Sequence, residues 1–500
     1  MTDKIKPNSY AALDAAHHFH PYSNAKRIEN QGPMVIAKGK GIKVWDDQGN
    51  EYIEAMAGLW SVAVGFGEER LVEAAKKQLE TLPYYHSFTH KSHPAVAQLS
   101  QKLTEIVGLN MTHAHYTNSG SEANDSAMKM IWYYNNALNR PEKKKIISRF
   151  KAYHGITIAS GSLTGIPLMH NDFDLPIKQV LHTRCPHYWR EGQEGETEEE
   201  FATRCAKELE DLIIKEGPET IAAFFGEPVM GAGGLIVPPK TYWKKIQEVC
   251  KKYDILIVAD EVINGFGRTG KRFACELYGI EPDLIILSKQ ITSNYIPMGV
   301  VLMTDKIYEP IAENTVKNNL YGSGFTSAGH PVACAVSLEN IKILEEEGLM
   351  ERVSSLEPVF QERLKNLEKK ELVGEARGVG LMGAVELVKD KETFAPFDPI
   401  GSAGPVLAEV GHSEGIILRA IGDVLAVCPP LIIKENEIHE LFDRFENTLD
   451  KFKNAVGKNV SLAQDRFNDA ISEIDKSISH LQKTKEALLV SKKHYICAKL

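Results

Sequence analysis

The 500-residue chain has few of the features that mark secreted, membrane or nucleic-acid-binding proteins. Its seven cysteines are odd in number and show no C-x-x-C spacing, which favours reduced thiols over a disulfide framework. No apolar run is long enough to cross a bilayer, and the polar start of the chain is not followed by the apolar core of a signal peptide. The net charge of −9 argues against nucleic acid as a partner. We therefore expect a cytoplasmic protein without a nucleic-acid or membrane partner.

What the chain does have is length and a regular alternation of patterns. A hydrophobic content of 43% over 500 residues can build a large core and exceeds one ordinary domain. Short apolar runs typical of buried strands alternate with amphipathic helical stretches, which predicts an α/β fold with a mostly parallel sheet. The predicted strands are 146–149, 221–225, 255–258, 284–287 and 299–303.

The chain divides into four segments. Residues 1–60 read as an arm and a hairpin, which we assign to a smaller domain; 61–329 form the large domain, and 330–455 complete the smaller one. In the tail, 456–500, apolar residues recur at four-three spacing, which predicts an amphipathic helix. Packing of this helix against the body and self-association are both open.

Two opposite charges close two of the predicted strands. Asp260 ends one apolar run, and Lys289 follows the next, about thirty positions later. An amine attacks an aldehyde only when it is unprotonated, a state that burial favours, whereas a buried carboxylate would keep a pyridine nitrogen protonated. Together they suit pyridoxal 5'-phosphate (PLP) held by Lys289 as a Schiff base. Residues two apart share a face of a strand, so Val262 should project with Asp260 and Glu261 should point away.

An Asn-Ser-Gly-Ser-Glu-Ala-Asn run at 118–124 opens a helical stretch. Backbone amides at such a helix start, with Gly120 allowing close approach and a hydroxyl at Ser121, form a cup for a phosphate. An ordinary helix cap is the simpler reading of the same residues.

Two other patterns are poor guides to function. Residues 265–270 spell G-x-G-x-x-G after a strand, but the following strand ends at Ser288 and Lys289, where a dinucleotide site would need an acid. His17, His18 and His20 suggest a metal, but no nearby cysteine or carboxylate cluster completes a ligand set. We therefore expect neither a dinucleotide nor a metal.

Taken together and in order, the motifs resemble class III of the fold-type I PLP-dependent aminotransferases, specifically the ω-amine:pyruvate transaminase group. The resemblance runs from about Tyr22 to Phe452. The motifs that carry it are 56–61, 118–124, 153–155, 226–229, the strand ending at Asp260, 288–289 and 324–326.

This resemblance implies a large domain with a mostly parallel sheet of the seven-stranded type and a smaller α+β domain. It makes Lys289 the catalytic residue, which binds the cofactor and moves a proton between substrate carbon and cofactor. Thr326 would reach the phosphate of the neighbouring subunit, so the enzyme would be a homodimer with active sites at its interface. The residues expected to bind the cofactor are Gly120, Ser121, Tyr153, His154, Glu227, Asp260, Val262 and Thr326.

Two departures from related groups bear on the substrate. Ornithine- and γ-aminobutyrate-type relatives carry an acid five positions after the Glu of the Glu-Pro motif, paired with an Arg near a Pro-Pro pair; Ala232 takes the place of that acid here. Instead, Arg419 resembles the mobile Arg of the ω-amine:pyruvate group, which grips a carboxylate and swings out for an apolar amine. Trp60, Phe88 and Tyr153 would line the substrate pocket with Ala232 and Arg419.

The expected reaction is a two-half ping-pong exchange that moves an amino group from a primary amine or ω-amino acid to an α-keto acid, with pyruvate as the favoured acceptor. A racemase, an aminomutase or a decarboxylase on the same fold is the alternative, and a scaffold protein that has lost its chemistry is a further one. β-Alanine, putrescine, taurine and aryl amines are all compatible donors.

Overall fold

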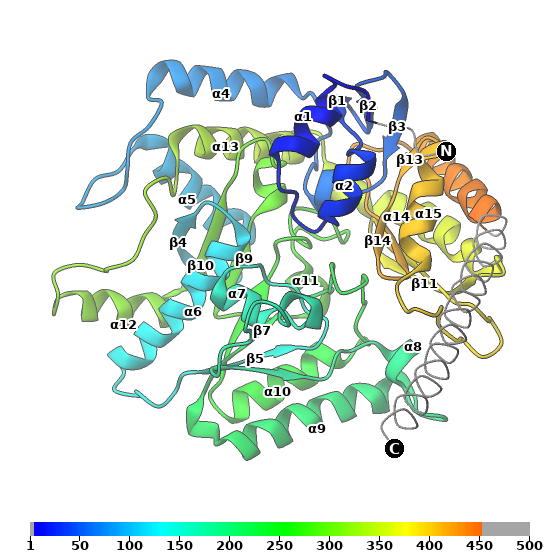
Figure 1. Ribbon diagram of the computed structural model, residues 1–500. Coiled ribbons are helices and arrows are strands. Elements are labelled where there is room, and N and C mark those ends of the chain that lie inside the picture. The colour runs from blue at the N-terminus through cyan, green and yellow to red at the C-terminus, as the bar shows by residue number, and fades with distance from the viewer. Residues whose placement is uncertain (1–4, 453–500) are drawn as a thin grey trace, which may run out of the picture.

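A computed structural model describes residues 5–452 of the chain. Its centre is a seven-stranded sheet with the order β4-β10-β9-β8-β7-β5-β6, in which only β10 runs against its neighbours (Figure 1). This confirms the predicted α/β class and mostly parallel sheet. The strands are β4 (Met111–Thr117), β5 (Lys145–Arg149), β6 (Val180–Thr183), β7 (Ile221–Gly226), β8 (Leu256–Asp260), β9 (Leu284–Leu287) and β10 (Gly299–Thr304).

Successive residues of each central strand enter two different cores. In β8, Leu256 and Val258 pack on the side of α6, whereas Ile257 and Ala259 join the core on the opposite face. Burial on both faces explains why these strands are apolar without alternation. The first face is covered by α6 (Gly120–Ala137), α7 (Ile158–Leu163) and α12 (Asp305–Thr315). The second is covered by α5 (Pro94–Val107), α9 (Glu198–Glu216), α10 (Tyr242–Lys252), α11 (Ala274–Tyr278) and α13 (Pro331–Glu346).

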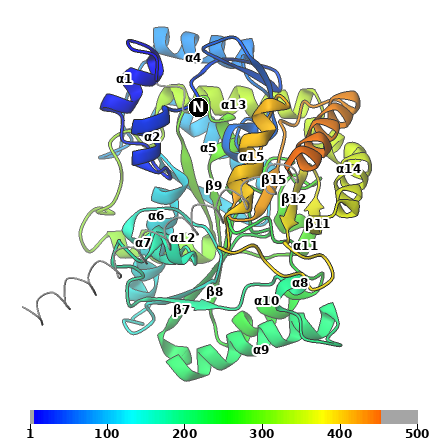
Figure 2. The ribbon, with the colours of Figure 1, turned by 45° about the vertical axis from the view of Figure 1, so that its right-hand side comes forward.

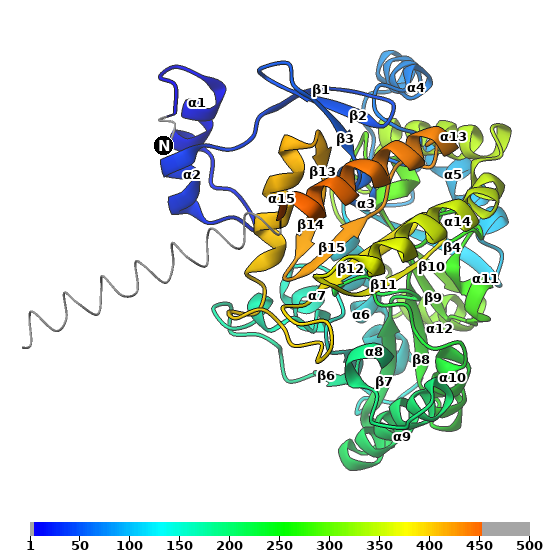
Figure 3. The same cartoon turned by 90° about the vertical axis from the view of Figure 1, so that its right-hand side faces the viewer.

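Two four-stranded sheets flank this centre. One joins the predicted hairpin to a distant strand in the order β1-β2-β3-β13, and the other has the order β11-β12-β15-β14. Helix α14 (Leu349–Asn366) and the last described helix, 435–452, lie over the second sheet (Figure 3). The Phe360 ring of α14 packs edge to face on Phe442 of the last helix. Their strands are β1 (Ile36–Lys40), β2 (Lys43–Asp46), β3 (Glu51–Glu54), β11 (Val373–Val379), β12 (Met382–Leu387), β13 (Ile416–Ile417), β14 (Arg419–Ile421) and β15 (Val424–Val427).

The remaining helices surround these sheets, and α4 packs along α13 (Figure 2). They are α1 (Tyr10–His17), α2 (Ala25–Gln31), α3 (Ala57–Trp60), α4 (Glu69–Thr81), α8 (Tyr188–Glu191), α14 (Leu349–Asn366) and α15 (Ala403–Ser413), with short 3₁₀ turns at Pro167–Met169, Pro218–Thr220, Lys289–Thr292 and Leu367–Lys369. No helix within residues 5–452 is long and apolar enough to cross a membrane. The domain boundaries at 60, 329 and 455 stay predictions, and the predicted tail helix at 456–500 lies outside the described residues.

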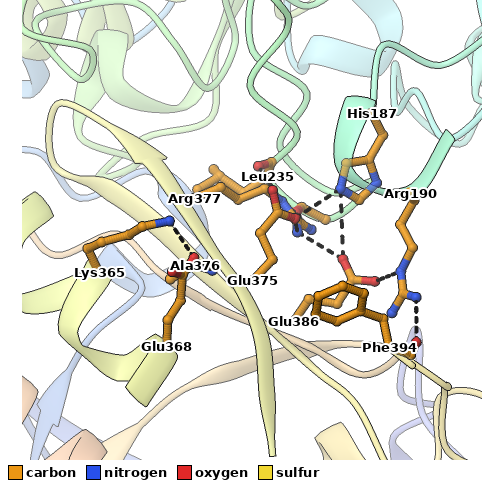
Figure 4. A network of polar contacts seen from close by, with 11 residues as sticks. His187, Arg190, Leu235, Lys365, Glu368, Glu375, Ala376, Arg377, Glu386 and Phe394 are labelled. Carbon is orange, nitrogen blue, oxygen red and sulfur yellow. Dashed lines mark hydrogen bonds and ion pairs between the residues drawn. The ribbon is translucent and has the colours of Figure 1, made fainter. Parts of the chain in front are cut away.

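A buried guanidinium ties β11 to the loop that follows β7. Arg377 donates to Glu386 at 2.8 Å and to Glu375, and its other nitrogens donate to the backbone carbonyls of Gly234 at 2.6 Å and Leu235 at 3.1 Å (Figure 4). Because Arg377 is only 9% exposed, its charge is compensated by these partners and not by water.

We expect Arg377→Ala to destabilise the protein by about 3 kcal/mol, because it leaves the carboxylates of Glu375 and Glu386 buried beside an empty space. Urea titration followed by fluorescence would measure the change as a lower unfolding midpoint. Lys207→Ala is the control, since Lys207 pairs with Asp211 on α9, where both side chains are more than half exposed, and should shift the midpoint little. Equal midpoints for the two variants would contradict the role of the network.

Candidate active site

The pocket lies where the parallel strands end at their carboxyl edge, the usual position of ligand sites in such sheets. Asp260 closes β8, Glu227 follows β7, and Lys289 follows β9 after Ser288. The residues that line it are Gly120, Ser121, Asn124, Tyr153, His154, Gly155, Glu227, Asp260, Val262, Ile263, Ser288 and Lys289. Seven of the eight residues expected to bind the cofactor are thus brought together, and Thr326 is the exception.

The Asp260 carboxylate is buried and firmly oriented. It is 3% exposed and shares the face of Leu256 and Val258, which directs it toward α6. His154 Nδ1 lies 2.8 Å from its Oδ2, Asn124 Nδ2 donates to the same oxygen at 3.0 Å, and the amide of Val262 donates to Oδ1 at 3.1 Å. These partners fix the direction in which the carboxylate can receive a further donor.

Glu261, the next residue, points to the other side as the strand pattern predicted. Its Oε1 accepts a hydrogen bond of 2.7 Å from the amide of Cys275. Burial raises the pKa of Glu261 to about 7. Glu261 therefore belongs to the packing of α11 and not to the pocket.

Lys289 brings an amine into the pocket. Burial lowers the pKa of Lys289 to about 8, although Asp260 and Glu227 act in the opposite direction. Within residues 5–452 its Nζ forms no ion pair, and it lies 5.7 Å from the centre of the Trp60 ring. The backbone of Lys289 has φ of 47°, an unusual value for a non-glycine residue and one that is often found at functional sites.

The first turn of α6 forms a small cradle. Gly120 begins the helix, and an added Cβ there would lie 3.3 Å from Val262 and 3.4 Å from Ser288. At Gly155, with φ of 135°, an added Cβ would lie only 2.5 Å from the hydroxyl of Ser121. These glycines leave room beside backbone amides at a helix start, where a phosphate could be bound.

Glu227 lines the pocket and also holds two of its loops. Its buried carboxylate accepts hydrogen bonds from the amides of Tyr153 at 3.0 Å and Gly231 at 2.9 Å, and burial raises the pKa of Glu227. It lines the pocket but is engaged in holding the loops that carry Tyr153 and Gly231. Its contribution to a cofactor is therefore to place Tyr153.

Beside the pocket lies a guanidinium that has no acidic partner within residues 5–452. Arg419, the first residue of β14, lies over Trp60 at 5.1 Å from the ring centre. Its buried Nε and the indole Nε1 of Trp60 both lack hydrogen-bond partners among the described residues. Burial lowers the pKa of Arg419, and the group nevertheless stays charged. Ala232 packs into the same apolar cluster as Trp60.

Sequence reasoning did not assign a site role to Asn124, Gly155, Ile263 or Ser288, which line the pocket, or to Tyr22, which contacts Tyr153. Asn124 lies one helix turn after Gly120, a spacing that could have shown it to face the pocket. Tyr22 donates to or accepts from the Tyr153 hydroxyl at 3.3 Å; no sequence signal predicts this contact, which spans 131 positions.

Phe88 and Thr326 lie together but away from the pocket of their own chain. Phe88 is 45% exposed and sits beside Gly324, and Tyr84 donates to the carbonyl of the exposed Thr326 at 2.7 Å. Neither residue lines the pocket around Lys289.

Fold and site define a PLP-dependent enzyme of fold type I. The residues fit the cofactor: a buried acid for the ring nitrogen, an amine of lowered pKa for the aldehyde, and a glycine cradle at a helix start for the phosphate. The family model for class-III aminotransferases matches residues 25–449. The chain therefore belongs to this family, and it is an aminotransferase that uses PLP.

The similar proteins are of two kinds. The chain is 50% identical over 422 residues to gamma aminobutyrate transaminase 1, mitochondrial, from Solanum lycopersicum, covering 84% of this chain and 82% of the relative. It is 47% identical over 430 residues to probable gamma-aminobutyrate transaminase 3, mitochondrial, from Oryza sativa subsp. indica, covering 86% and 84%. Among solved structures, the omega transaminase from Pseudomonas jessenii in complex with PMP is similar with a TM-score of 0.89 and 51% identity, covering 90% of this chain and 99% of that one.

We expect the apoenzyme to bind the PLP aldehyde covalently with a rate that rises about tenfold per pH unit up to pH 8 and then levels off. The reason is that only the neutral Lys289 amine attacks, and its pKa is about 8. Stopped-flow absorbance would follow the reaction, with Lys289→Ala as the control that should show no covalent absorbance band. A rate that still climbs at pH 10, or a retained band in Lys289→Ala, would contradict the assignment.

Proposed function

We propose that this enzyme moves an amino group from a primary amine or ω-amino acid to a monocarboxylic α-keto acid, with pyruvate as the acceptor. The observation that carries the proposal is the Arg419 guanidinium, which is stacked on Trp60 and has no acidic partner among the described residues. The bound cofactor supplies the aldehyde that receives the amino group and a ring that accepts electrons.

Each residue of the pocket then has a defined task. Lys289 Nζ gives up or accepts the proton at the substrate carbon, and a pKa near 8 allows both directions near neutral pH. Asp260 holds the proton of the ring nitrogen, since His154 and Asn124 fix the carboxylate. Trp60 and Tyr153 exclude water and orient the apolar part of the amine.

The cations of the pocket favour an acceptor with one carboxylate. Among the described residues that line the pocket, Lys289 is the only cation, and Arg419 adds a single guanidinium beside Trp60. One guanidinium can bind one carboxylate through two parallel hydrogen bonds, and a dicarboxylic acceptor would bring a second carboxylate with no cation to receive it. Ala232 is consistent with this interpretation, because the acid that γ-aminobutyrate-type relatives carry at this place is replaced here by an apolar residue in the same cluster as Trp60.

The relatives support a donor of the ω-amino type. Those from Solanum lycopersicum and Oryza sativa are named gamma-aminobutyrate transaminases, and a γ-amino acid would place its carboxylate on Arg419 with its amine near Lys289. A similar solved structure is described as a thermostable omega transaminase variant engineered for asymmetric synthesis of enantiopure bulky amines, which supports amines without a carboxylate as a second class of donor to test. A cytoplasmic location is part of the proposal, supported by six free thiols in the described residues.

We expect Arg419→Met to lower kcat/KM roughly 10- to 100-fold for pyruvate and for γ-aminobutyrate, because a charge-assisted bidentate contact contributes about 1.5–3 kcal/mol. The thioether keeps the stem packed on Trp60, so an aryl amine without a carboxylate should react at an unchanged rate in its own half-reaction. Single-turnover absorbance measurements of each half-reaction separate the two effects. A uniform loss across all donors would contradict the role of Arg419.

The parent enzyme should form one alanine from pyruvate for each amine consumed. A racemase or a decarboxylase would not form alanine in this ratio.

We further propose a homodimer in which Thr326 serves the pocket of the partner chain, since Thr326 and Phe88 are exposed and absent from the pocket of their own chain. Refolding an inactive Lys289→Ala chain together with an inactive Thr326→Asp chain should restore activity. In such a mixed dimer, one pocket combines an intact Lys289 with an intact Thr326 from the other chain. If Thr326 acted within its own chain, both pockets would carry one defect and the mixture would stay inactive.

A further inference from the structure

A cluster of two histidines and one carboxylate lies in the N-terminal arm, outside the pocket. Asp14 Oδ2 is 3.2 Å from His18 Nδ1, and Asp14 Oδ1 forms a hydrogen bond with His20 Nε2. The three ligand atoms all lie within 4.8 Å of one another. Helices α1 and α2 stand side by side at the edge of the molecule, and the cluster lies where α1 ends (Figure 3).

Local structure brings these residues together. Asp14 and His18 are four positions apart, so the helix puts them on one face. The chain leaves α1 at His18, whose amide still donates to the carbonyl of Asp14 at 2.8 Å, and then folds back so that the rings of His18 and His20 lie 4.3 Å apart. Asp14 is the carboxylate that sequence analysis did not connect with the histidines, because only the helix end makes them neighbours.

We propose that Asp14, His18 and His20 bind one divalent transition-metal ion of the zinc class. Two imidazole nitrogens and a carboxylate oxygen are a donor set that Zn²⁺ prefers, with water in the fourth position. Metal–ligand distances of about 2.1 Å place ligand atoms about 3.4 Å apart in a tetrahedral site, so small side-chain rotations suffice. The proposal is independent of the substrate assigned above.

Charge and access favour an ion at this position. Among the described residues, the ion pairs of Asp14 are to His18 and His20, so no lysine or arginine neutralises it. Its side chain is 27% exposed, and those of His18 and His20 are 58% and 20% exposed. The ligand atoms are therefore held together and still reachable from solvent.

A second group with metal-binding composition, formed by His187, Glu375 and Glu386, differs in this respect. The Arg377 guanidinium already donates to both of its carboxylates. A permanent cation thus occupies the position that a metal would take, which makes His187 a useful control (Figure 4).

A bound ion would anchor the segment that reaches the active site. Tyr22 follows His20 by two positions, has φ of 52°, and places its hydroxyl 3.3 Å from that of Tyr153. Fixing His20 to α1 would therefore shorten the free chain between the helix and Tyr22.

The test is calorimetric titration of tag-free holoenzyme with ZnCl₂, repeated with Co²⁺ to obtain its visible absorption. We expect one site per chain and at least tenfold weaker binding in His18→Ala and in His20→Ala, because even residues that only orient ligands change metal affinity 10- to 100-fold. His17→Ala, which alters an exposed histidine of the same helix outside the cluster, should bind as the parent does.

Two further measurements distinguish the cluster from general histidine binding. His187→Ala should leave the affinity unchanged, and circular dichroism with cofactor absorbance should show that all variants are folded. Binding that is equal in the parent and in a His18→Ala, His20→Ala double variant would overturn the proposal, as would an equal loss in His17→Ala or the absence of zinc binding by the parent. Protection of the arm from limited proteolysis by Zn²⁺, lost in the double variant, would support the anchoring of Tyr22.

Discussion

Chemistry in the pocket depends on keeping a buried amine and a buried carboxylate in one site without letting them pair. Asp260 closes β8, and Lys289 follows the adjacent parallel strand β9. A direct ion pair between them would favour the charged form of each group and so keep the amine protonated. The Asp260 carboxylate instead forms hydrogen bonds with His154, Asn124 and the amide of Val262. Lys289 is left with desolvation as the largest influence on its pKa. The residues around Asp260 therefore assist burial in keeping Lys289 reactive.

The proposed substrate side also depends on a buried charge, here the positive charge of Arg419. A buried guanidinium without a carboxylate is costly. Stacking on Trp60 recovers only about 0.5–2 kcal/mol of that cost. Arg419 is thus held in place by an aromatic ring and remains short of an anion. Such a group gains most from a carboxylate that arrives with the substrate, which is why we assign the substrate carboxylate to Arg419.

Sequence patterns predicted the parts of the molecule that depend on local periodicity. The strands around 146, 221, 256, 284 and 299, the helix that starts at Gly120 and the opposite directions of Asp260 and Glu261 all follow from apolar runs and the two-residue repeat. The reversed direction of β10 was not predictable, because an apolar run carries no information on strand direction. β6 was missed, since only Val180 and Thr183 of its four residues are buried. The Tyr22–Tyr153 contact and the engagement of Glu227 by backbone amides depend on loops that meet only in three dimensions.

Chemistry and specificity are consequently encoded in different parts of the chain. The groups that carry chemistry stand at the ends of central strands, whose positions the sheet fixes. The groups that we propose to select substrates come from the periphery, Trp60 from α3 and Arg419 from β14, and Tyr22 of the arm contacts Tyr153. Phe88 and Gly324 meet on an exposed surface, where a Cβ on Gly324 would lie 3.0 Å from the Phe88 ring. Because these peripheral segments are separate from the strands that hold Asp260 and Lys289, we expect a change in one of them to alter substrate preference more than cofactor chemistry.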